Sequence, residues 1–186
     1  MSRLSSLLRN SNDASNPSAE ALRSLLGTVE TVAVVGLSRD PLKAARRVPS
    51  YLAAKGYHVI PVNPNAESIL GQPARDSLDE VTEPVDLVLL FRPSEEAGQF
   101  VEAAARRDER PAIWLQEGIM APEATAAARE AGLTVVQDLC IFKAHRSLPD
   151  NQPRRPARWS IRRQQEGAAP PPEQEGEART DAPRQG

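Results

Sequence analysis

Residues 31–38 decide the fold, and they read Thr-Val-Ala-Val-Val-Gly-Leu-Ser. The run before the glycine consists of β-branched and small apolar residues, without the polar alternation of a strand that faces solvent on one side. Such a continuous run is typical of a strand covered on both faces, as in a parallel sheet. Because the glycine permits a tight turn, the stretch predicts the first strand of an α/β sheet and a loop that leads into a helix.

Four more short apolar runs follow along the chain, and Ala-rich amphipathic segments lie between them. This alternation predicts the α/β class and, within it, a Rossmann-like doubly wound parallel sheet of about five strands with helices on both faces. Ser94 is predicted as the N-cap of one helix, and Gly56 and Gly132 follow the ends of two others. The further strands are predicted at residues 58–62, 87–91, 112–115 and 134–137, and the helices at 18–26, 48–55, 95–107 and 122–131.

The 186 residues divide unevenly into three parts. Residues 17–148 carry the alternating pattern and have the length that one hydrophobic core prefers. Residues 1–16 are rich in Ser and Asn without a clear pattern, so they are predicted to form a flexible leader. Residues 149–186 are rich in Pro, Arg and Glu. They contain too few large apolar residues to offset the entropy of ordering, so this tail is predicted to be disordered.

Composition excludes several classes of protein. One Cys and two His cannot form a disulfide framework, nor a zinc site of four thiolates or of two thiolates and two imidazoles. The longest apolar runs fall far short of the roughly 20 residues that cross a bilayer, and residues 1–10 do not resemble a signal peptide. No membrane association and a cytoplasmic location are therefore expected. The Arg-rich segment 154–163 is followed by acidic residues, so nucleic acid is not a favoured partner. A homodimer is one option for the oligomeric state.

In a sheet of this type, ligands bind where the carboxyl ends of the strands meet. Gly36 occupies the first position of the phosphate-binding pattern G-x-G-x-x-G, but Ser38 and Pro41 occupy the other two glycine positions. Asn63 stands where NAD-binding proteins place an acidic residue for the ribose, which argues against NAD. A basic cluster beside the next helix favours a ligand richer in phosphate, since cations near a helix N-terminus suit a polyanion. The cluster consists of Arg39, Lys43, Arg46 and Arg47.

Five motifs at predicted strand ends carry a resemblance to a known family. They are VAVVGLS at residues 32–38, GYHVIPVNP at 56–64, PVDLV at 84–88 leading to Phe91 and Arg92, WLQEG at 114–118, and Cys140 with His145. In this order they resemble the small single-domain CoA-binding proteins. The fold of that family is similar to the CoA-binding domain of the succinyl-CoA synthetase α subunit. The resemblance covers residues 17–148.

The resemblance implies coenzyme A as the small-molecule ligand. It implies that the phosphates lie near Gly36 and Ser38, and that the adenosine end lies near the strand ends at Asn63 and Phe91. An arginine at the start of the following helix would then contact the 3′-phosphate or the pyrophosphate. The complete predicted site consists of Gly36, Leu37, Ser38, Arg39, Lys43, Arg46, Arg47, Val48, Asn63, Pro64, Phe91, Arg92, Gln116 and Gly118.

The chain departs from the family pattern at two places. The family usually has Pro-Ser-Tyr-Arg-Val where residues 44–48 read Ala-Ala-Arg-Arg-Val, and it usually has Arg where Leu139 stands. Beside the first departure, Pro49 is predicted to lie in the first turn of the helix at residues 48–55.

No pair of residues suited to acid–base catalysis is evident in the predicted crevice. We therefore expect a non-catalytic protein, not an enzyme, that holds coenzyme A or an acyl-CoA. Glu117 is expected to be solvated or to cap a helix. Cys140 is either a reactive thiol near the pantetheine end of the ligand or a small buried side chain. The alternatives for the whole protein are an NAD(P)-dependent reductase and a nucleotide-sensing interaction protein that uses the same crevice.

Overall fold

The structure is a computed structural model, and it describes residues 2–149. Apart from residue 149, the predicted tail lies outside the described residues. Five parallel strands form one sheet in the order β2-β1-β5-β6-β7, which confirms the predicted class and strand number. The strands are β1 (Thr31–Val35), β2 (His58–Val62), β5 (Leu87–Leu90), β6 (Ala112–Leu115) and β7 (Val135–Val136).

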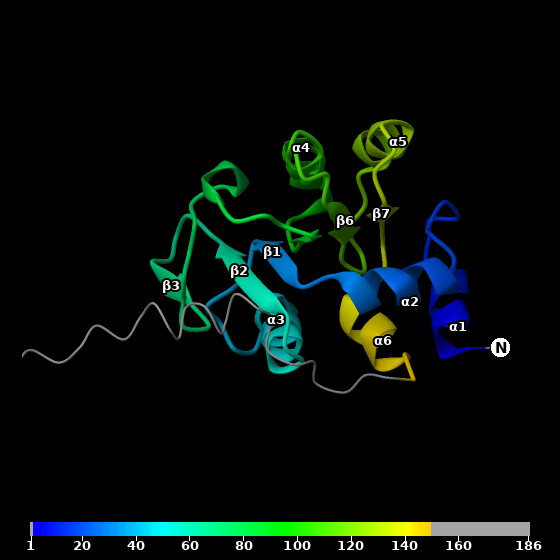
Figure 1. Ribbon diagram of the computed structural model, residues 1–186, viewed down its shortest axis with the longest axis horizontal. Coiled ribbons are helices and arrows are strands. Elements are labelled where there is room, and N and C mark those ends of the chain that lie inside the picture. The colour runs from blue at the N-terminus through cyan, green and yellow to red at the C-terminus, as the bar shows by residue number, and fades with distance from the viewer. Residues whose placement is uncertain (1, 150–186) are drawn as a thin grey trace, which may run out of the picture.

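Helices cover both faces of this sheet (Figure 1). On one face lie α4 (Ser94–Ala105) and α5 (Pro122–Glu130), and on the other α3 (Ala44–Ala54) and α6 (Ile141–Arg146). Successive residues of a strand point to opposite faces. Val32 and Val34 accordingly belong to one buried cluster, and Ala33 and Val35 belong to the other. This explains why the predicted strands are apolar throughout. Among residues 2–149, no helix is long and apolar enough to cross a membrane.

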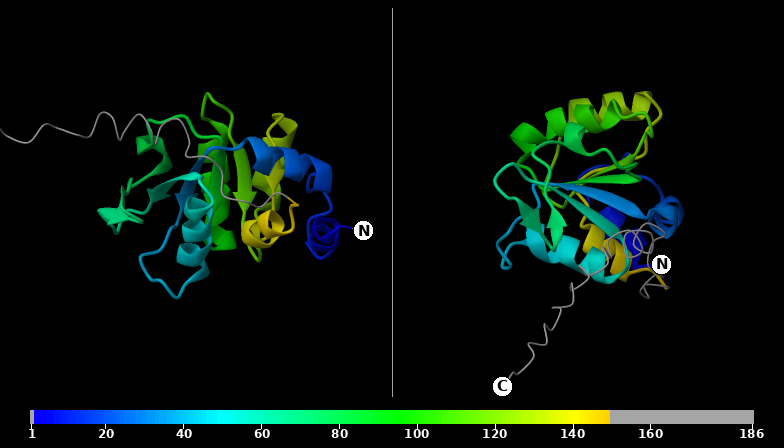
Figure 2. Two further views of the ribbon diagram at one scale, coloured as in Figure 1. Left: turned by 60° about the horizontal axis from the view of Figure 1, so that its bottom comes forward. Right: turned by 60° about the vertical axis from the view of Figure 1, so that its left-hand side comes forward.

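The structure differs from the predicted flexible leader at the N-terminus. Helix α1 (Arg3–Arg9) begins after Ser2, whose side chain accepts a hydrogen bond from the Ser5 N–H. Leu4 is only 1% exposed. Helix α1 packs against α6 and against α2 (Ala19–Thr28), as the neighbouring ribbons show (Figure 2). The N-terminal segment is thus ordered by contacts with α2 and with the helix at the end of the folded unit.

Two predicted helix starts are wrong. Helix α3 begins at Ala44, four residues before the predicted start, so Pro49 lies in its second turn. Helix α4 has Pro93 at its N-cap, and Ser94 is its first residue. The Ser94 hydroxyl instead accepts a hydrogen bond from the Met120 N–H at 3.0 Å. Ser94 thereby joins α4 to the loop after β6.

The structure also contains short elements that were not predicted. Strands β3 (Ser68–Ile69) and β4 (Gln72–Pro73) form an antiparallel hairpin after β2. Its two-residue turn needs positive φ at both positions, and Leu70 and Gly71 adopt φ 58° and 70°. A single 3₁₀ turn, η1 (Leu78–Glu80), and helix α6 complete the set. The hairpin borders the candidate site, because Ser68 lines a cavity described below.

Candidate functional site

The site lies where the sheet changes winding direction. From β1 the chain passes to β2 on one side, and later to β5 on the other. The Gly36 N–H donates to the Val62 carbonyl at 3.0 Å, and the Phe91 N–H donates to the Val35 carbonyl at 2.9 Å. In doubly wound sheets, the crevice at this point is where ligands bind.

A cavity of about 560 Å³ opens at this point, and we call it the main cavity. Residues from the loops after β1, β2 and β5 line this cavity, in agreement with the prediction that these loops meet. Asp40, Asn65, Asp76 and Phe100 also line it; the predicted set does not include them, because they belong to none of the strand-end motifs and are not cations of the basic cluster. The predicted residues that line it are Gly36, Ser38, Arg39, Lys43, Asn63, Pro64, Phe91 and Arg92.

Gly36 is required where β1 ends. Its φ is 82°, a left-handed conformation that residues with a Cβ rarely adopt. A Cβ at this position would lie 2.8 Å from the Phe91 carbonyl oxygen and 2.9 Å from Cδ of Arg92. The glycine therefore permits both the turn and the close approach of the loops after β1 and β5.

The loop after Gly36 leads to an uncapped helix. The Ser38 hydroxyl accepts a hydrogen bond from the Asp40 N–H at 3.1 Å, and Asp40 Oδ1 accepts one from the Leu42 N–H at 2.9 Å. Lys43 occupies the N-cap of α3, and its side chain makes no capping hydrogen bond. Because Lys43 and Ala45 both line the main cavity, the first turn of α3 borders it. The N–H groups of that turn and the helix dipole favour an anion there.

The three cations of the main cavity are not equivalent. Arg92 pairs with Glu96, one helical turn along, so its charge is partly neutralised. Arg39 and Lys43 make no ion pair within residues 2–149. Arg39 and Lys43 are therefore the cations best suited to meet an anionic ligand in this cavity.

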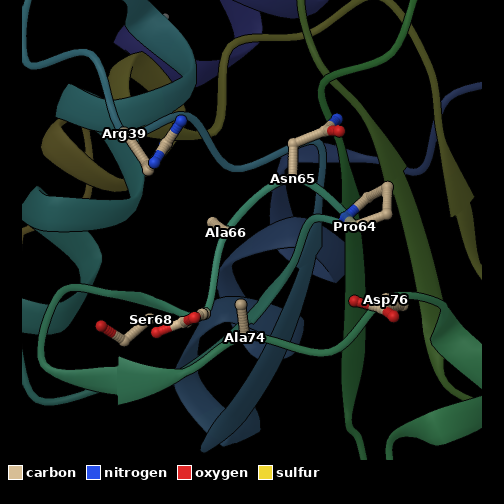
Figure 3. Close-up of a pocket in the computed structure, with 8 residues that line it drawn as sticks. Arg39, Pro64, Asn65, Ala66, Ser68, Ala74 and Asp76 are labelled. Carbon is tan, nitrogen blue, oxygen red and sulfur yellow. The ribbon is translucent and has the colours of Figure 1, made fainter.

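A second cavity of about 570 Å³ adjoins the main cavity and shares Arg39, Pro64, Asn65 and Asp76 with it. Figure 3 shows that Arg39 approaches it from the loop after β1, whereas the other residues come from the segment after β2. Ser68 contributes its hydroxyl oxygen from the side of the hairpin, and Glu67 also lines this cavity. This cavity therefore combines one cation with two carboxylates.

Six predicted site residues line neither cavity. Leu37 and Val48 are buried in the hydrophobic core. Arg46 and Arg47 lie on α3 beyond the residues that border the main cavity. The remaining two, Gln116 and Gly118, lie after β6. The position of the two arginines follows from the helix start, because α3 begins at Ala44 and places them in its first turns and not in the loop.

Residues 30–146 match the family described as the CoA binding domain. The chain belongs to this family. It is also similar to the uncharacterized protein YneT of Bacillus subtilis, with 38% identity over 130 residues that cover 70% of this chain and 96% of YneT. The resemblance inferred from the five motifs is thus confirmed.

Solved structures similar to this member of the CoA-binding domain family have the same fold. One from Thermus thermophilus is 38% identical with a TM-score of 0.65, and covers 70% of this chain and 98% of its own. A hypothetical protein from Pyrococcus horikoshii is 30% identical with a TM-score of 0.68, and covers 74% of this chain and 96% of its own. Helices α1 and α2 precede the residues that match the family.

In this CoA-binding-family chain, the WLQEG motif has a structural role after β6. Gln116 Nε2 donates to Cys140 Sγ at 3.1 Å, and Gln116 Oε1 accepts from the Ile141 N–H at 3.1 Å. The Gln116 amide thus holds the start of α6. Cys140 is 8% exposed, which favours the interpretation of a small buried side chain. Glu117, expected to be solvated or capping, pairs with Lys143 at 2.7 Å.

Asp138 joins three segments of the chain at the end of β7. Its carboxylate accepts hydrogen bonds from the Gly118 N–H at 2.7 Å and from the backbone and side-chain amides of Asn12 at 2.9 and 2.8 Å. Burial alone would raise the pKa of Asp138, but these hydrogen bonds outweigh it and lower the pKa below its ordinary value. The ionised carboxylate is therefore the form that holds the N-terminal segment to the WLQEG loop.

Protonation of Asp138 should reduce stability. Because its folded-state pKa is lowered, its contribution is complete above the unfolded pKa of about 3.9 and is lost as pH falls through the folded pKa. We expect Asp138→Asn to lower the free energy of unfolding by about 1.5 to 3 kcal/mol near neutral pH. The difference from the native chain should shrink below about pH 4. Urea unfolding of both chains, from neutral pH to below about pH 4, measures both effects. A difference in the free energy of unfolding that stays constant with pH would contradict the prediction. Asn also tolerates the φ of 51° found here.

Proposed function

We propose that this protein binds coenzyme A or an acyl-CoA in the main cavity and the adjoining second cavity, and that it holds the ligand without catalysing a reaction. One observation carries the proposal: Arg39, Lys43 and the uncapped N-terminus of α3 meet at the main cavity. Two cations and a helix N-terminus form an environment suited to the phosphates of such a ligand.

The chemistry of the two cavities fits the parts of the ligand differently. The phosphates suit the side of Arg39 and Lys43 in the main cavity, whereas Glu67 in the second cavity and Asp76, which lines both cavities, would repel phosphates placed beside them. Those carboxylates can instead accept hydrogen bonds from amino and hydroxyl groups of a nucleoside. Each volume lies within the range of roughly 300 to 1,000 Å³ usual for ligand sites. A long ligand can use both cavities because Arg39, Pro64, Asn65 and Asp76 line both.

The lining of both cavities supports a role without catalysis. Among the described residues, neither cavity is lined by a His or a Cys. The Asp40 carboxylate is engaged by the Leu42 N–H in shaping the loop. A general acid or base needs a free group within hydrogen-bonding distance of the reacting atom. Glu67 and Asp76 remain as carboxylates of the lining, and no His or Cys of either lining accompanies them to form an acid–base pair. These residues therefore support a role in holding the ligand.

Isothermal titration of the full chain with CoA, 3′-dephospho-CoA and NADPH tests the proposal. We expect binding of CoA, weaker binding of the dephospho form, and no binding of NADPH. Native mass spectrometry of protein purified without added ligand should then show an adduct of CoA or acyl-CoA mass. Absence of CoA binding at millimolar ligand would overturn the proposal, and binding of NADPH alone would favour the reductase alternative.

Arg39 provides a direct test of the site. Arg39→Ala should weaken CoA binding by about 1.5 to 3 kcal/mol, or roughly 10- to 150-fold, because a charge-assisted phosphate contact is lost. Arg47→Ala is the matched control, since it removes the same charge from an exposed position outside both cavities. We expect that control to change the dissociation constant by less than about threefold. Equal weakening in the two variants would place the phosphates elsewhere on the basic surface.

A further inference from the structure

Pro49 is buried inside helix α3. A proline has no N–H, so the carbonyl four residues earlier loses its normal helical donor, and the ring pushes that carbonyl aside. For Pro49 this carbonyl belongs to Ala45. A proline in a helix interior is strongly disfavoured. Because the Ala45 carbonyl has lost its helical donor, it needs another hydrogen-bond donor.

The partner is the loop at the main cavity. The Ser38 N–H donates to the Ala45 carbonyl at 3.1 Å. Ser38 and Ala45 both line the main cavity, so this bond joins the loop after β1 to the first turn of α3 at the site itself. The Ser38 hydroxyl in turn accepts the Asp40 N–H. The backbone that leads to Arg39 is therefore held at a carbonyl that the helix does not use.

We propose that Pro49 is a positioning residue for the ligand loop. By withholding its N–H, it leaves the Ala45 carbonyl available to Ser38 and fixes the loop, and with it Arg39, against α3. Any other residue at position 49 would donate to the Ala45 carbonyl and draw it back toward the helix axis, where it meets Ser38 less well. The role in ligand binding rests on the proposed function, whereas the effect on the loop does not.

Pro49→Ala tests this inference because it should loosen the loop and weaken CoA binding without lowering the stability of the fold. In the absence of ligand, we expect hydrogen exchange of the Ser38 amide, followed by NMR, to become at least tenfold faster, while amides of β1 keep their protection. The urea midpoint should stay unchanged or rise, because α3 gains a hydrogen bond. CoA affinity should fall at least threefold. Pro122→Ala is the matched control, since Pro122 begins α5, where a missing N–H costs no helical bond.

A second variant separates the missing N–H from the packing of the ring. Lactic acid at position 49 carries an ester oxygen in place of the N–H and a methyl group like that of Ala. Ser38 should keep its slow exchange in this variant. The positioning role is overturned if the Ser38 amide loses as much protection in the lactic acid variant as in Pro49→Ala. It is also overturned if Ser38 exchange in Pro49→Ala is the same as in the native chain. If Ser38 responds as expected but the native chain binds no CoA, the proposed function fails and the role in fixing the loop stands.

Discussion

Gly36→Ala is expected to lower the free energy of unfolding by roughly 2 to 5 kcal/mol and to abolish CoA binding. The φ of 82° alone imposes a strain of about 1 to 3 kcal/mol on a residue with a Cβ. The new methyl group would also lie 2.8 Å from the Phe91 carbonyl oxygen. That oxygen belongs to the backbone directly after β5, so relief requires the loops after β1 and β5 to separate.

The loss of binding follows from the same displacement. Gly36, Phe91 and Arg92 all line the main cavity, and their movement changes its shape and the position of the following loop. Urea unfolding gives the change in stability, and isothermal titration with CoA gives the change in affinity. A variant that binds CoA like the native chain would show that the approach of the two loops is not part of the site.

Gly71→Ala is the matched control. Gly71 also has a positive φ, 70°, but a Cβ there would meet no atom within 4 Å. Only the strain of the left-handed conformation remains, about 1 to 3 kcal/mol. The amount by which Gly36→Ala loses more unfolding free energy than Gly71→Ala therefore measures the clash with the loop after β5. Equal losses in the two variants would show that the clash is relieved without cost.

Deletion of residues 2–16 is expected to lower the free energy of unfolding by at least about 3 kcal/mol. Burial of a leucine such as Leu4 typically contributes about 2 to 5 kcal/mol when compared with alanine. The deletion also leaves buried partners unsatisfied: Asp138 loses Asn12, and Gln137 loses Asn16. A flexible leader, as the sequence pattern predicts, would leave the urea midpoint unchanged. The two interpretations therefore predict clearly different results.

Two point variants locate the effect of the deletion. Leu4→Ala should account for about 2 kcal/mol or more of the loss, whereas Arg9→Ala, at an exposed position of the same helix, should change stability by less than about 0.5 kcal/mol. Circular dichroism confirms that each variant is folded before urea is added. If Leu4→Ala is as stable as the native chain, helix α1 does not contribute to the core.

The success of the strand predictions has a local cause. A strand covered on both faces has to be apolar at every position, and this pattern is visible in the sequence of β1 without knowledge of its partners. Helix α1 could also have been found, because Ser2 is a suitable N-cap and Leu4, Leu7 and Leu8 have helical spacing. That signal is short, and a helix of this length is stable only through its tertiary contacts.

The composition of the site was harder to predict than its location. The carboxyl ends of parallel strands meet at one edge of the sheet, which is why Gly36, Asn63 and Phe91, predicted together, all line the main cavity. The basic residues between strands depend on where α3 begins. A start at Ala44 brings Arg39 and Lys43 to the main cavity and carries Arg46 and Arg47 away from it.

The sequence by itself determined the α/β class, the five strands, the family and the edge of the sheet at which the candidate site lies, because burial and turn requirements act on neighbouring residues. The tertiary structure alone decided which cations line the cavity, that the Ser38 N–H bonds the Ala45 carbonyl, and how the N-terminal segment is held. Asn12 and Asp138 are 126 residues apart in the chain. No local pattern records such a contact, since it forms only when the sheet brings the end of β7 beside the N-terminus.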